Sequence, residues 1–283
     1  PTAVAVAGRR FLYGQIHSCL LGAPKSVLPV CWREVNVSSD FPHQVKVLEG
    51  SIAEREKQLA GPWPDGALRV AVVNYEATWR MEEALARFAK GGLIIADESH
   101  RIKTPGAQQS KAMGRLGQVA AYRLMLTGTP VTQNPLDIWS QYRFLDPSIF
   151  GRSFYAFRNR YAIMGGYQNY QVVGYRNLDE LVERAHRIAF RITRAECLDL
   201  PPEVYTDIPV QLGPRARSIY RELEEQAVAR LSAEAAVSAP NVLTELLRLQ
   251  QVAGGWVNTD GGETVQVGTE KLDALMDLLE DLL

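Results

Sequence analysis

Two short apolar runs, each ending abruptly in polar residues, constrain the fold of this chain more than any other feature. Leu93–Ala96 leads directly into the stretch DESH at 97–100, and Tyr122–Leu126 leads into TGTP at 127–130. Apolar runs of this length are typical of strands that are buried on both faces of a parallel sheet. In open α/β sheets, ligands bind beyond the carboxyl ends of the strands. The sequence therefore predicts a doubly wound α/β fold with a site at the ends of these two strands.

The paired carboxylates Asp97 and Glu98 suit a nucleoside triphosphate. Mg²⁺ prefers oxygen ligands, so one carboxylate can hold the ion, usually through water. The other can orient or deprotonate the water that attacks the phosphate. An acidic turn exposed to solvent after any buried strand would show the same residues, so the pair alone leaves both interpretations open.

Strand-like and helix-like segments alternate up to residue 150, which is the pattern of a doubly wound domain. Ser51 followed by Glu54 matches a capping box, so we expect a helix to begin there. The strands expected before residue 93 are His17–Leu21, Val45–Leu48 and Leu68–Val73. The helices expected in the first 120 residues are Thr2–Tyr13, Ser51–Leu59, Met81–Phe88 and Gln108–Gly117.

Beyond residue 147 the sequence becomes rich in aromatic and basic side chains, above all between Phe150 and Tyr161. Interleaved aromatics and arginines can bind nucleic acid by stacking and charge. The same pattern also packs a helix against a core, and we favour packing here. The elements expected next are a glycine-tipped hairpin over Gly165–Tyr175, a helix over Asn177–Ala189, a strand over Val204–Leu212 and a helix over Pro214–Leu231.

Composition excludes several classes of protein. The formal net charge of −1 does not by itself indicate a nucleic-acid partner, so any basic surface must be local. The three cysteines are odd in number and form no C-x-x-C pair, which argues for an intracellular protein without a disulfide framework or zinc site. The sequence has no apolar stretch long enough to span a bilayer, so we expect no membrane association.

The residues DESH followed by RIKTPGAQQSKA, and then LMLTGTPVTQNPLDIWSQYRFLDP, resemble motifs II and III of the Swi/Snf-type ATPases. These are DEAH-box helicase-like, superfamily-two DNA translocases with two RecA-like lobes. The resemblance implies a RecA-like, P-loop-type ATP-binding lobe over 1–147, a mostly helical protrusion over 148–240 and a helical linker into a missing second lobe over 241–283. Leu198–Glu203 also resembles the family's L-P-P-K segment, with Glu203 in place of the lysine.

The same resemblance implies an ATP-dependent translocase or remodeller that uses ATP and Mg²⁺ and acts on double-stranded DNA. Asp97 would coordinate Mg²⁺ and Glu98 would position or activate water. Coupling of the nucleotide state to the DNA-contact loops would fall to His100, Thr127, Gly128 and Thr129.

The first residues match the family only in part. Thr2 aligns with the hydroxyl residue that binds Mg²⁺, and Pro1 falls where the phosphate-binding lysine of the P-loop is expected. The glycine loop itself is absent from the sequence, and its backbone N–H groups would cradle the phosphates. We therefore expect this chain to be a lobe-one fragment that does not turn over ATP alone.

By the same resemblance, three groups of residues would contact the DNA: Pro24, Lys25 and Ser26; Asn74 and Tyr75; Arg101 and Lys103. Lysine, arginine and hydroxyl side chains at loop ends are typical of contacts to backbone phosphates. Each group also has a simpler interpretation: an ordinary strand-to-helix turn at Pro24, a core position at Tyr75 and a solvated helix entry after DESH.

Two other functions remain open from the sequence. One is a restriction-type or RNA-directed superfamily-two helicase, although the run after DESH and the long insertion favour the Swi/Snf type. The other is a non-catalytic DNA- or partner-binding module on a degenerate lobe, which the missing P-loop and second lobe suggest. Either a bacterial or viral cytoplasm or a nucleus would suit such a protein.

Overall fold

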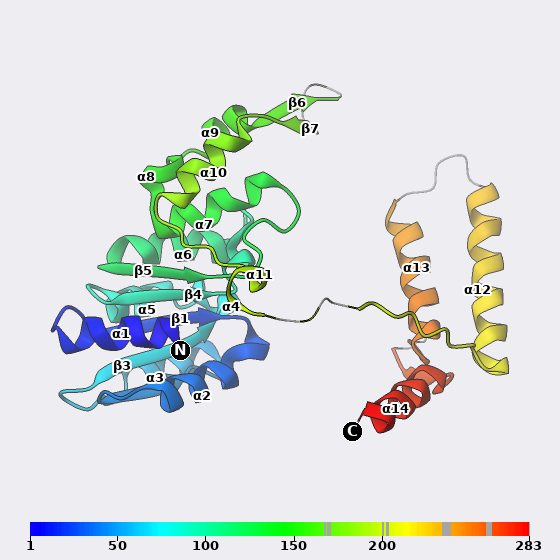
Figure 1. The fold of residues 1–283 in the computed structure, drawn as a ribbon, viewed down its shortest axis with the longest axis horizontal. Coiled ribbons are helices and arrows are strands. Elements are labelled where there is room, and N and C mark those ends of the chain that lie inside the picture. The colour runs from blue at the N-terminus through cyan, green and yellow to red at the C-terminus, as the bar shows by residue number, and fades with distance from the viewer. Residues whose placement is uncertain are drawn as a thin grey trace. The chain divides into compact units, whose positions relative to one another are not determined.

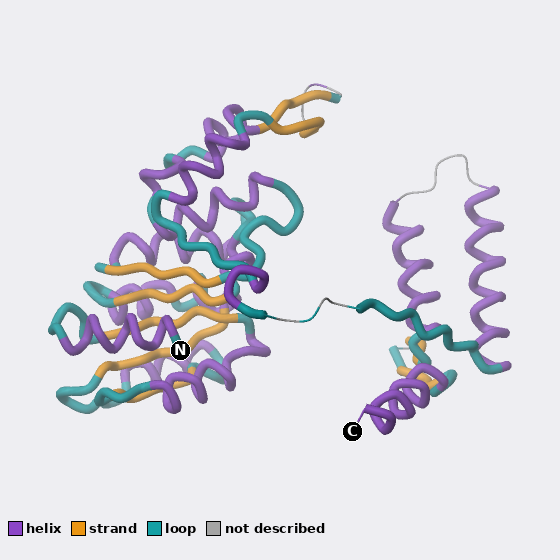
Figure 2. Tube along the Cα trace, viewed as in Figure 1, coloured by secondary structure: helices purple, strands orange, loops and turns teal. Residues whose placement is uncertain are grey.

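The computed structural model describes residues 1–166, 168, 171–199, 201, 204–233, 239–258 and 262–282, as Figures 1 and 2 show. Pro202 and Glu203, in the segment that resembles L-P-P-K, lie outside the described residues. The chain forms two compact units, Pro1–Ile192 and Thr193–Leu283.

The first unit is built on a five-stranded sheet in the order β2-β3-β1-β4-β5, and every pair in it is parallel. The strands are β1 Ser18–Ala23, β2 His43–Val47, β3 Leu68–Asn74, β4 Leu93–Asp97 and β5 Tyr122–Leu126. Because the sheet is parallel, these strands end at one edge, where the polar stretches after β1, β3, β4 and β5 come together. The predicted doubly wound α/β fold is confirmed.

Helices cover both faces of this sheet. On one face pack α1 Thr2–Leu12 and α2 Leu28–Ser38. On the other pack α3 Ile52–Ala60, α4 Tyr75–Thr78, α5 Glu82–Ala89 and α6 Gln108–Val119. Side chains of β4 alternate between the two faces, Leu93 and Ile95 toward the first core and Ile94 and Ala96 toward the second. Burial of both faces explains why β4 reads as a continuous apolar run.

Ser51 forms the predicted capping box. Its hydroxyl accepts from the Glu54 backbone N–H, and the Glu54 carboxylate accepts from the Ser51 N–H at 2.7 Å. Three short 3-10 turns complete this part of the chain, η1 Lys25–Val27, η2 Ser99–Ile102 and η3 Pro135–Asp137.

The aromatic segment beyond residue 147 forms a core of its own. Its elements are α7 Ile138–Leu145, α8 Pro147–Phe150, α9 Phe154–Tyr161, the antiparallel pair β6 Ala162–Gly165 and β7 Gln171–Tyr175, and α10 Leu178–His186. Phe150, Phe157 and Tyr161 are buried against one another, with ring centroids 4.8–6.1 Å apart. This packing accounts for the aromatic pattern, and Tyr155 alone of the α9 aromatics is well exposed.

The second unit contains α11 Arg194–Cys197, α12 Pro214–Ala233, α13 Ala239–Ala253, β8 Trp256–Asn258, β9 Thr264–Gln266 and α14 Glu270–Leu282. The strand expected over Val204–Leu212 is wrong, because 204–213 has no regular secondary structure. No described strand pairs with this segment, and Pro209 lacks the N–H that a central strand needs. Among the described helices, none is both long and apolar enough to cross a bilayer.

Candidate nucleotide and DNA site

The candidate site lies at the carboxyl edge of the sheet. In the strand register Gly22 of β1 pairs with Ala96 of β4, and Ala23 pairs with Asn74 of β3. Asp97 pairs with Leu126, the last residue of β5. Helix α1 runs back antiparallel to β1, so its N-terminus at Thr2 faces the same edge (Figure 1). The chain therefore brings five predicted groups of site residues together from separate parts of the sequence.

The Asp97–Glu98 turn has an unusual backbone. Glu98 lies in the left-handed region with φ 49° and ψ 53°. For a residue other than glycine this conformation costs on the order of 1–3 kcal/mol and persists only where neighbours fix it. The Glu98 N–H donates to Asp97 Oδ1 at 3.1 Å, and its carbonyl accepts from the Arg101 N–H at 3.0 Å. The turn leaves the Glu98 side chain 43% exposed.

Two buried side chains brace Asp97. The Tyr75 hydroxyl donates to the Asp97 carbonyl at 2.6 Å, and the Cys31 thiol lies 3.9 Å from Asp97 Oδ2. Burial, with the nearby Asp97 charge, raises the pKa of the Cys31 thiol to about 11, so the group stays a neutral, weak donor. Gly22 makes room for this brace, since a Cβ there would lie 3.3 Å from the Tyr75 ring.

The residues present fit a Mg²⁺–nucleotide. Among the described residues, Asp97 Oδ2 has the Cys31 thiol at 3.9 Å as its one hydrogen-bond partner, and the side chain is partly exposed. Thr2 is exposed in the first turn of α1, where backbone N–H groups are free to bind an anion. No cluster of three or more His, Cys, Asp or Glu in the described chain could hold a metal by itself. A few protein oxygens completed by phosphate and water is the usual arrangement for Mg²⁺.

The loop after β1 presents the first of the residues predicted to contact DNA. Pro24 is buried and turns the chain, and its carbonyl accepts from the Val27 N–H at 2.9 Å. Lys25 and Ser26 follow on the surface. A hydrogen bond from Asn74 lowers the pKa of the Glu76 carboxyl, burial opposes that shift, and the charges of Arg101 and Lys25 lower the pKa further. Lys25 and Arg101 therefore share one electrostatic neighbourhood.

Asn74 and Tyr75 lie inside this edge. Asn74 is 7% exposed, accepts from an Arg55 guanidinium nitrogen at 2.5 Å and donates to Glu76 Oε2 at 2.8 Å. Tyr75 is 1% exposed, which favours the core interpretation of this residue. Sequence reasoning missed Arg55, because one arginine on a charged helix looks like a solvated residue.

Lys103 also faces the protein. Its ammonium lies 3.4 Å from Asp137 Oδ2 and donates to the Thr132 hydroxyl. Asp137 Oδ2 accepts from the backbone N–H groups of Thr132 and Gln133 at 3.2 and 3.0 Å. Asp137 thus pins the loop after TGTP, and Lys103 ties that loop to the segment after DESH.

A second bridge, centred on the two buried side chains of Ser99 and Gln141, joins the same two motifs. The Ser99 hydroxyl donates to Gln141 Oε1 at 2.7 Å, and Gln141 Nε2 donates to the Pro130 carbonyl at 2.6 Å. Ser99 and Gln141 are both 0% exposed. A glutamine within the apolar helix sequence I-W-S-Q-Y-R-F was the available signal, and the sequence analysis did not use it.

The coupling residues expected at this site make local contacts. His100 Nδ1 lies 3.2 Å from Glu98 Oε2 without hydrogen-bond geometry, and the Thr127 hydroxyl accepts from the Thr129 N–H at 3.1 Å. A Cβ on Gly128 would meet nothing within 4 Å, so the backbone there is open to close approach. The described contacts that join DESH to the TGTP loop are those of Ser99 and Lys103.

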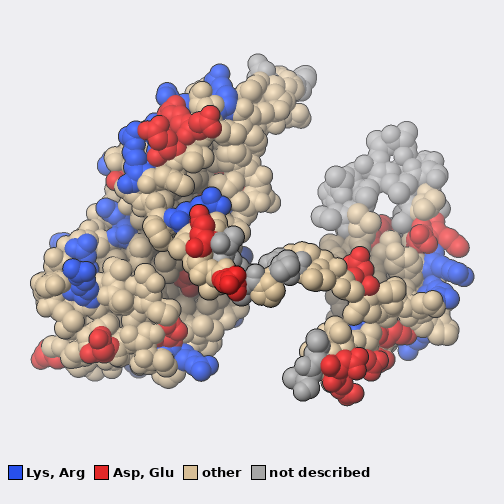
Figure 3. Space-filling model, in the orientation of Figure 1, with Lys and Arg blue, Asp and Glu red and all other residues tan. Residues whose placement is uncertain are grey.

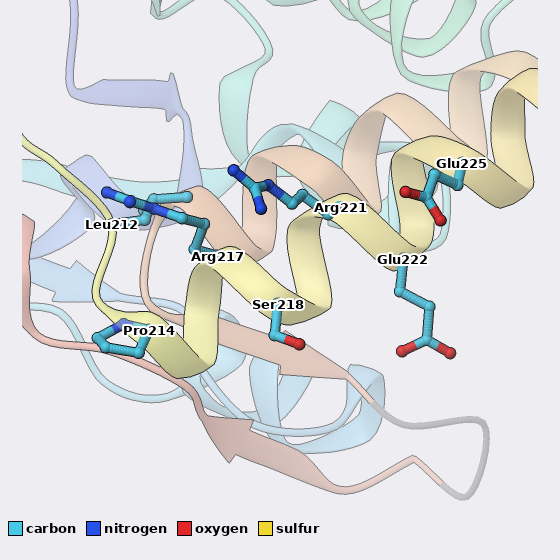
Figure 4. A pocket seen from close by; sticks show the side chains of 7 residues that line it. All are labelled: Leu212, Pro214, Arg217, Ser218, Arg221, Glu222 and Glu225. Carbon is cyan, nitrogen blue, oxygen red and sulfur yellow. The ribbon is translucent and has the colours of Figure 1, made fainter.

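The surfaces outside this edge of the sheet give weaker evidence of a functional site. Basic and acidic side chains are interspersed on the face that Figure 3 shows, in keeping with the net charge of −1. A hollow of about 610 Å³ lies along α12, with two arginines and two glutamates among its lining residues (Figure 4). It belongs wholly to the second unit and contains no residue of the two motifs.

Comparison with known proteins decides the family. Residues 12–254 match the family described as SNF2-related domain. The chain belongs to this family. The SNF2-related match and the shared fold confirm the predicted Swi/Snf-type superfamily-two ATPase lobe.

Among the relatives of this SNF2-related chain are a plant protein and a phage protein. ISWI chromatin-remodeling complex ATPase CHR11 of Arabidopsis thaliana is 28% identical over 216 residues. Protein p41 of Acyrthosiphon pisum secondary endosymbiont phage 1 is 27% identical over 224 residues. Each alignment covers 75% of this chain but only 19% of CHR11 and 48% of p41. The chain thus spans half or less of the length of these relatives.

A solved structure shares the fold. The Sulfolobus solfataricus SWI2/SNF2 ATPase core in complex with dsDNA superposes with a TM-score of 0.56 at 24% sequence identity. The match covers 98% of this chain and 56% of that chain.

Proposed function

We propose that this chain supplies the first lobe of an ATP-dependent, double-stranded DNA translocase or remodeller. The observation that carries the proposal is the strand register, which puts the exposed Lys25–Ser26 loop and the Asp97–Glu98 turn on one edge of one sheet. A change at the nucleotide then lies next to the loop that would hold DNA. The family membership of the chain and the functions named for its relatives support this proposal.

The proposed chemistry follows from the two carboxylates. A bound Mg²⁺–ATP supplies the electrophilic phosphorus and neutralises its developing charge. Asp97 would hold the ion, and its position is fixed by Tyr75 and by its own bond to the Glu98 N–H. Glu98, whose acidic side chain is partly exposed, would orient the attacking water and accept its proton. Thr2 adds a second oxygen at the N-terminus of α1.

The proposed DNA contacts are made to phosphates. Lys25, Ser26 and Arg101 are exposed donors at loop ends, where they can reach a backbone but present no helix of base-reading side chains. Asn74, Tyr75 and Lys103 are given a bracing role instead, because their side chains are bonded inside the protein. The division into a lobe over 1–147, a protrusion over 148–240 and a linker over 241–283 remains part of the proposal.

Replacing Lys25 with alanine is expected to weaken binding to all duplex sequences alike. Each cation that neutralises a phosphate on duplex DNA contributes about 0.9 to the slope of log affinity against log salt concentration. The Lys25→Ala chain should therefore lose about one unit of that slope. Titration of labelled duplexes of unrelated sequence at several salt concentrations measures it.

Lys90→Ala is the matched control, since Lys90 is also exposed but precedes β4 at the opposite edge of the sheet. Its salt slope should equal that of the wild-type chain. An unchanged slope in Lys25→Ala would remove Lys25 from the DNA path. A loss confined to one sequence would indicate base readout in place of phosphate contact.

A further inference from the structure

We propose that Gln141 is a positioning residue, a buried strut that holds the catalytic turn and the TGTP loop in one joint arrangement. The inference rests on the proposed function, because it assigns a route between the carboxylates of DESH and the loop that follows β5. It concerns a residue that lies outside both motifs, on helix α7.

The hydrogen bonds of Gln141 fix its side-chain amide in one orientation. Its oxygen accepts from the Ser99 hydroxyl, and its nitrogen donates to two carbonyls, those of Pro130 at 2.6 Å and Asp137 at 3.0 Å. Rotating the amide by half a turn would point its oxygen at both carbonyls, which can only accept. Because the side chain is 0% exposed, water offers no alternative partner.

Each end of the strut holds a functional segment. Ser99 directly follows Glu98, whose left-handed backbone needs neighbours to fix it. Pro130 ends TGTP, and as a proline it has no N–H of its own with which to anchor the loop. A shift of the catalytic turn would pull on Ser99 and, through one amide, on the Pro130 carbonyl. Ser99 and Gln141 are 42 residues apart in the sequence, so this connection exists only in the folded chain.

The contacts of Lys103 with Asp137 and Thr132 join the same two segments as the strut, but they are more exposed to solvent. The Lys103 side chain is 21% exposed, so water can replace its partners when the loop moves. Gln141 and Ser99 have no such replacement. Movement of one segment without the other would leave a buried donor or acceptor unpaired, so the two segments are expected to shift together.

Residue-resolved hydrogen exchange on the 283-residue chain tests the strut without requiring catalysis. Ser99→Ala should speed exchange about tenfold at Glu98–Ile102, because the turn loses its buried anchor. It should also speed exchange by a similar factor at the Thr132 and Gln133 amides, which are bonded to Asp137 and not to Ser99. Faster exchange at Thr132 and Gln133 is the decisive result, because a Ser99 side chain that only stabilised its own turn would not change it.

Ser110→Ala is the matched control, since Ser110 is 2% exposed and its hydroxyl has no hydrogen-bond partner. It should leave both segments unchanged. Gln141→Asn keeps the amide but is one carbon too short to span the gap, and it should speed exchange in both segments. It serves as the second variant if Ser99→Ala does not fold. Faster exchange at the turn alone, or an equal effect of Ser110→Ala, would overturn the proposal.

Turnover measurements separate this inference from the proposed function. In a form of the protein that hydrolyses ATP, Gln141→Asn should lower the ratio of DNA-stimulated to basal turnover by about tenfold. An unchanged ratio would overturn the strut and leave the proposed function standing. The opposite outcome is also possible to observe: Ser99→Ala speeds hydrogen exchange in both segments, but the protein binds neither nucleotide nor DNA. That result would support the strut and contradict the proposed function.

Discussion

Replacing Glu98 with glutamine should lower ATP turnover by roughly 10²- to 10⁴-fold, the usual contribution of a positioned general base. Glutamine keeps the size of the side chain and can still contact a water, but it cannot accept the proton. ATP affinity should change little, because Asp97 and the turn itself remain. Steady-state turnover and equilibrium binding of a fluorescent ATP analogue measure the two effects. Both require a form of the protein that carries a phosphate-binding loop before Thr2.

Two companion variants sharpen this result. Asp97→Asn should weaken retention of the Mg²⁺–nucleotide, since it removes the charge that holds the ion. Glu83→Gln changes a glutamate whose side chain is 95% exposed on α5, and it should leave turnover and binding as they are. If Glu98→Gln hydrolysed ATP at close to the wild-type rate, the assignment of Glu98 would be wrong.

Replacing Asp137 with alanine should cost the first unit roughly 2–4 kcal/mol of unfolding free energy. The change leaves the backbone N–H groups of Thr132 and Gln133 without their acceptor, and it leaves Lys103 without its ion partner. Denaturant unfolding followed by tryptophan fluorescence measures the loss. Asp146→Ala is the control: it removes the cap bond from the Ser148 N–H and should cost only about 1 kcal/mol.

The cost of Asp137→Ala should depend on pH. Burial would raise the pKa of Asp137, but hydrogen bonds from Gln133 and Thr132 and the charge of Lys103 hold it below its ordinary value. A carboxyl with a lowered pKa contributes stability above the ordinary aspartate pKa of about 4 and loses it as the pH falls through the folded-state value. The difference between wild type and variant should therefore be full at pH 7 and shrink in acid. A difference that is constant down to pH 3 would contradict this account.

The sheet was predictable because its signal is local. A strand that is buried on both faces needs consecutive apolar residues, and β3 and β4 show them directly. The capping box at Ser51 is likewise a local signal, because it depends on residues within four consecutive positions. The strand expected over Val204–Leu212 failed for the opposite reason, since a strand exists only with a partner and no described strand provides one.

The site was predictable only in outline. Residue type and position after a strand predict Asp97, Glu98 and Lys25 as site residues. The side chains that contact Asp97 in the fold lie far away in the sequence. The bond between Ser99 and Gln141 spans 42 residues, and no periodicity announces it. The left-handed backbone of Glu98 also had no signal, because the sequence there contains no glycine. Such contacts depend on the finished fold.

The central claim is that one edge of this sheet serves both nucleotide and DNA. ATP turnover of the protein, carrying a phosphate-binding loop, with and without duplex DNA and with Mg²⁺ present or chelated, tests it most directly. The account predicts turnover that requires Mg²⁺, rises when duplex of any sequence is added, and loses much of that rise in Lys25→Ala but not in Lys90→Ala. Turnover that is indifferent to duplex DNA, or a rise that both lysine variants keep in full, would contradict it.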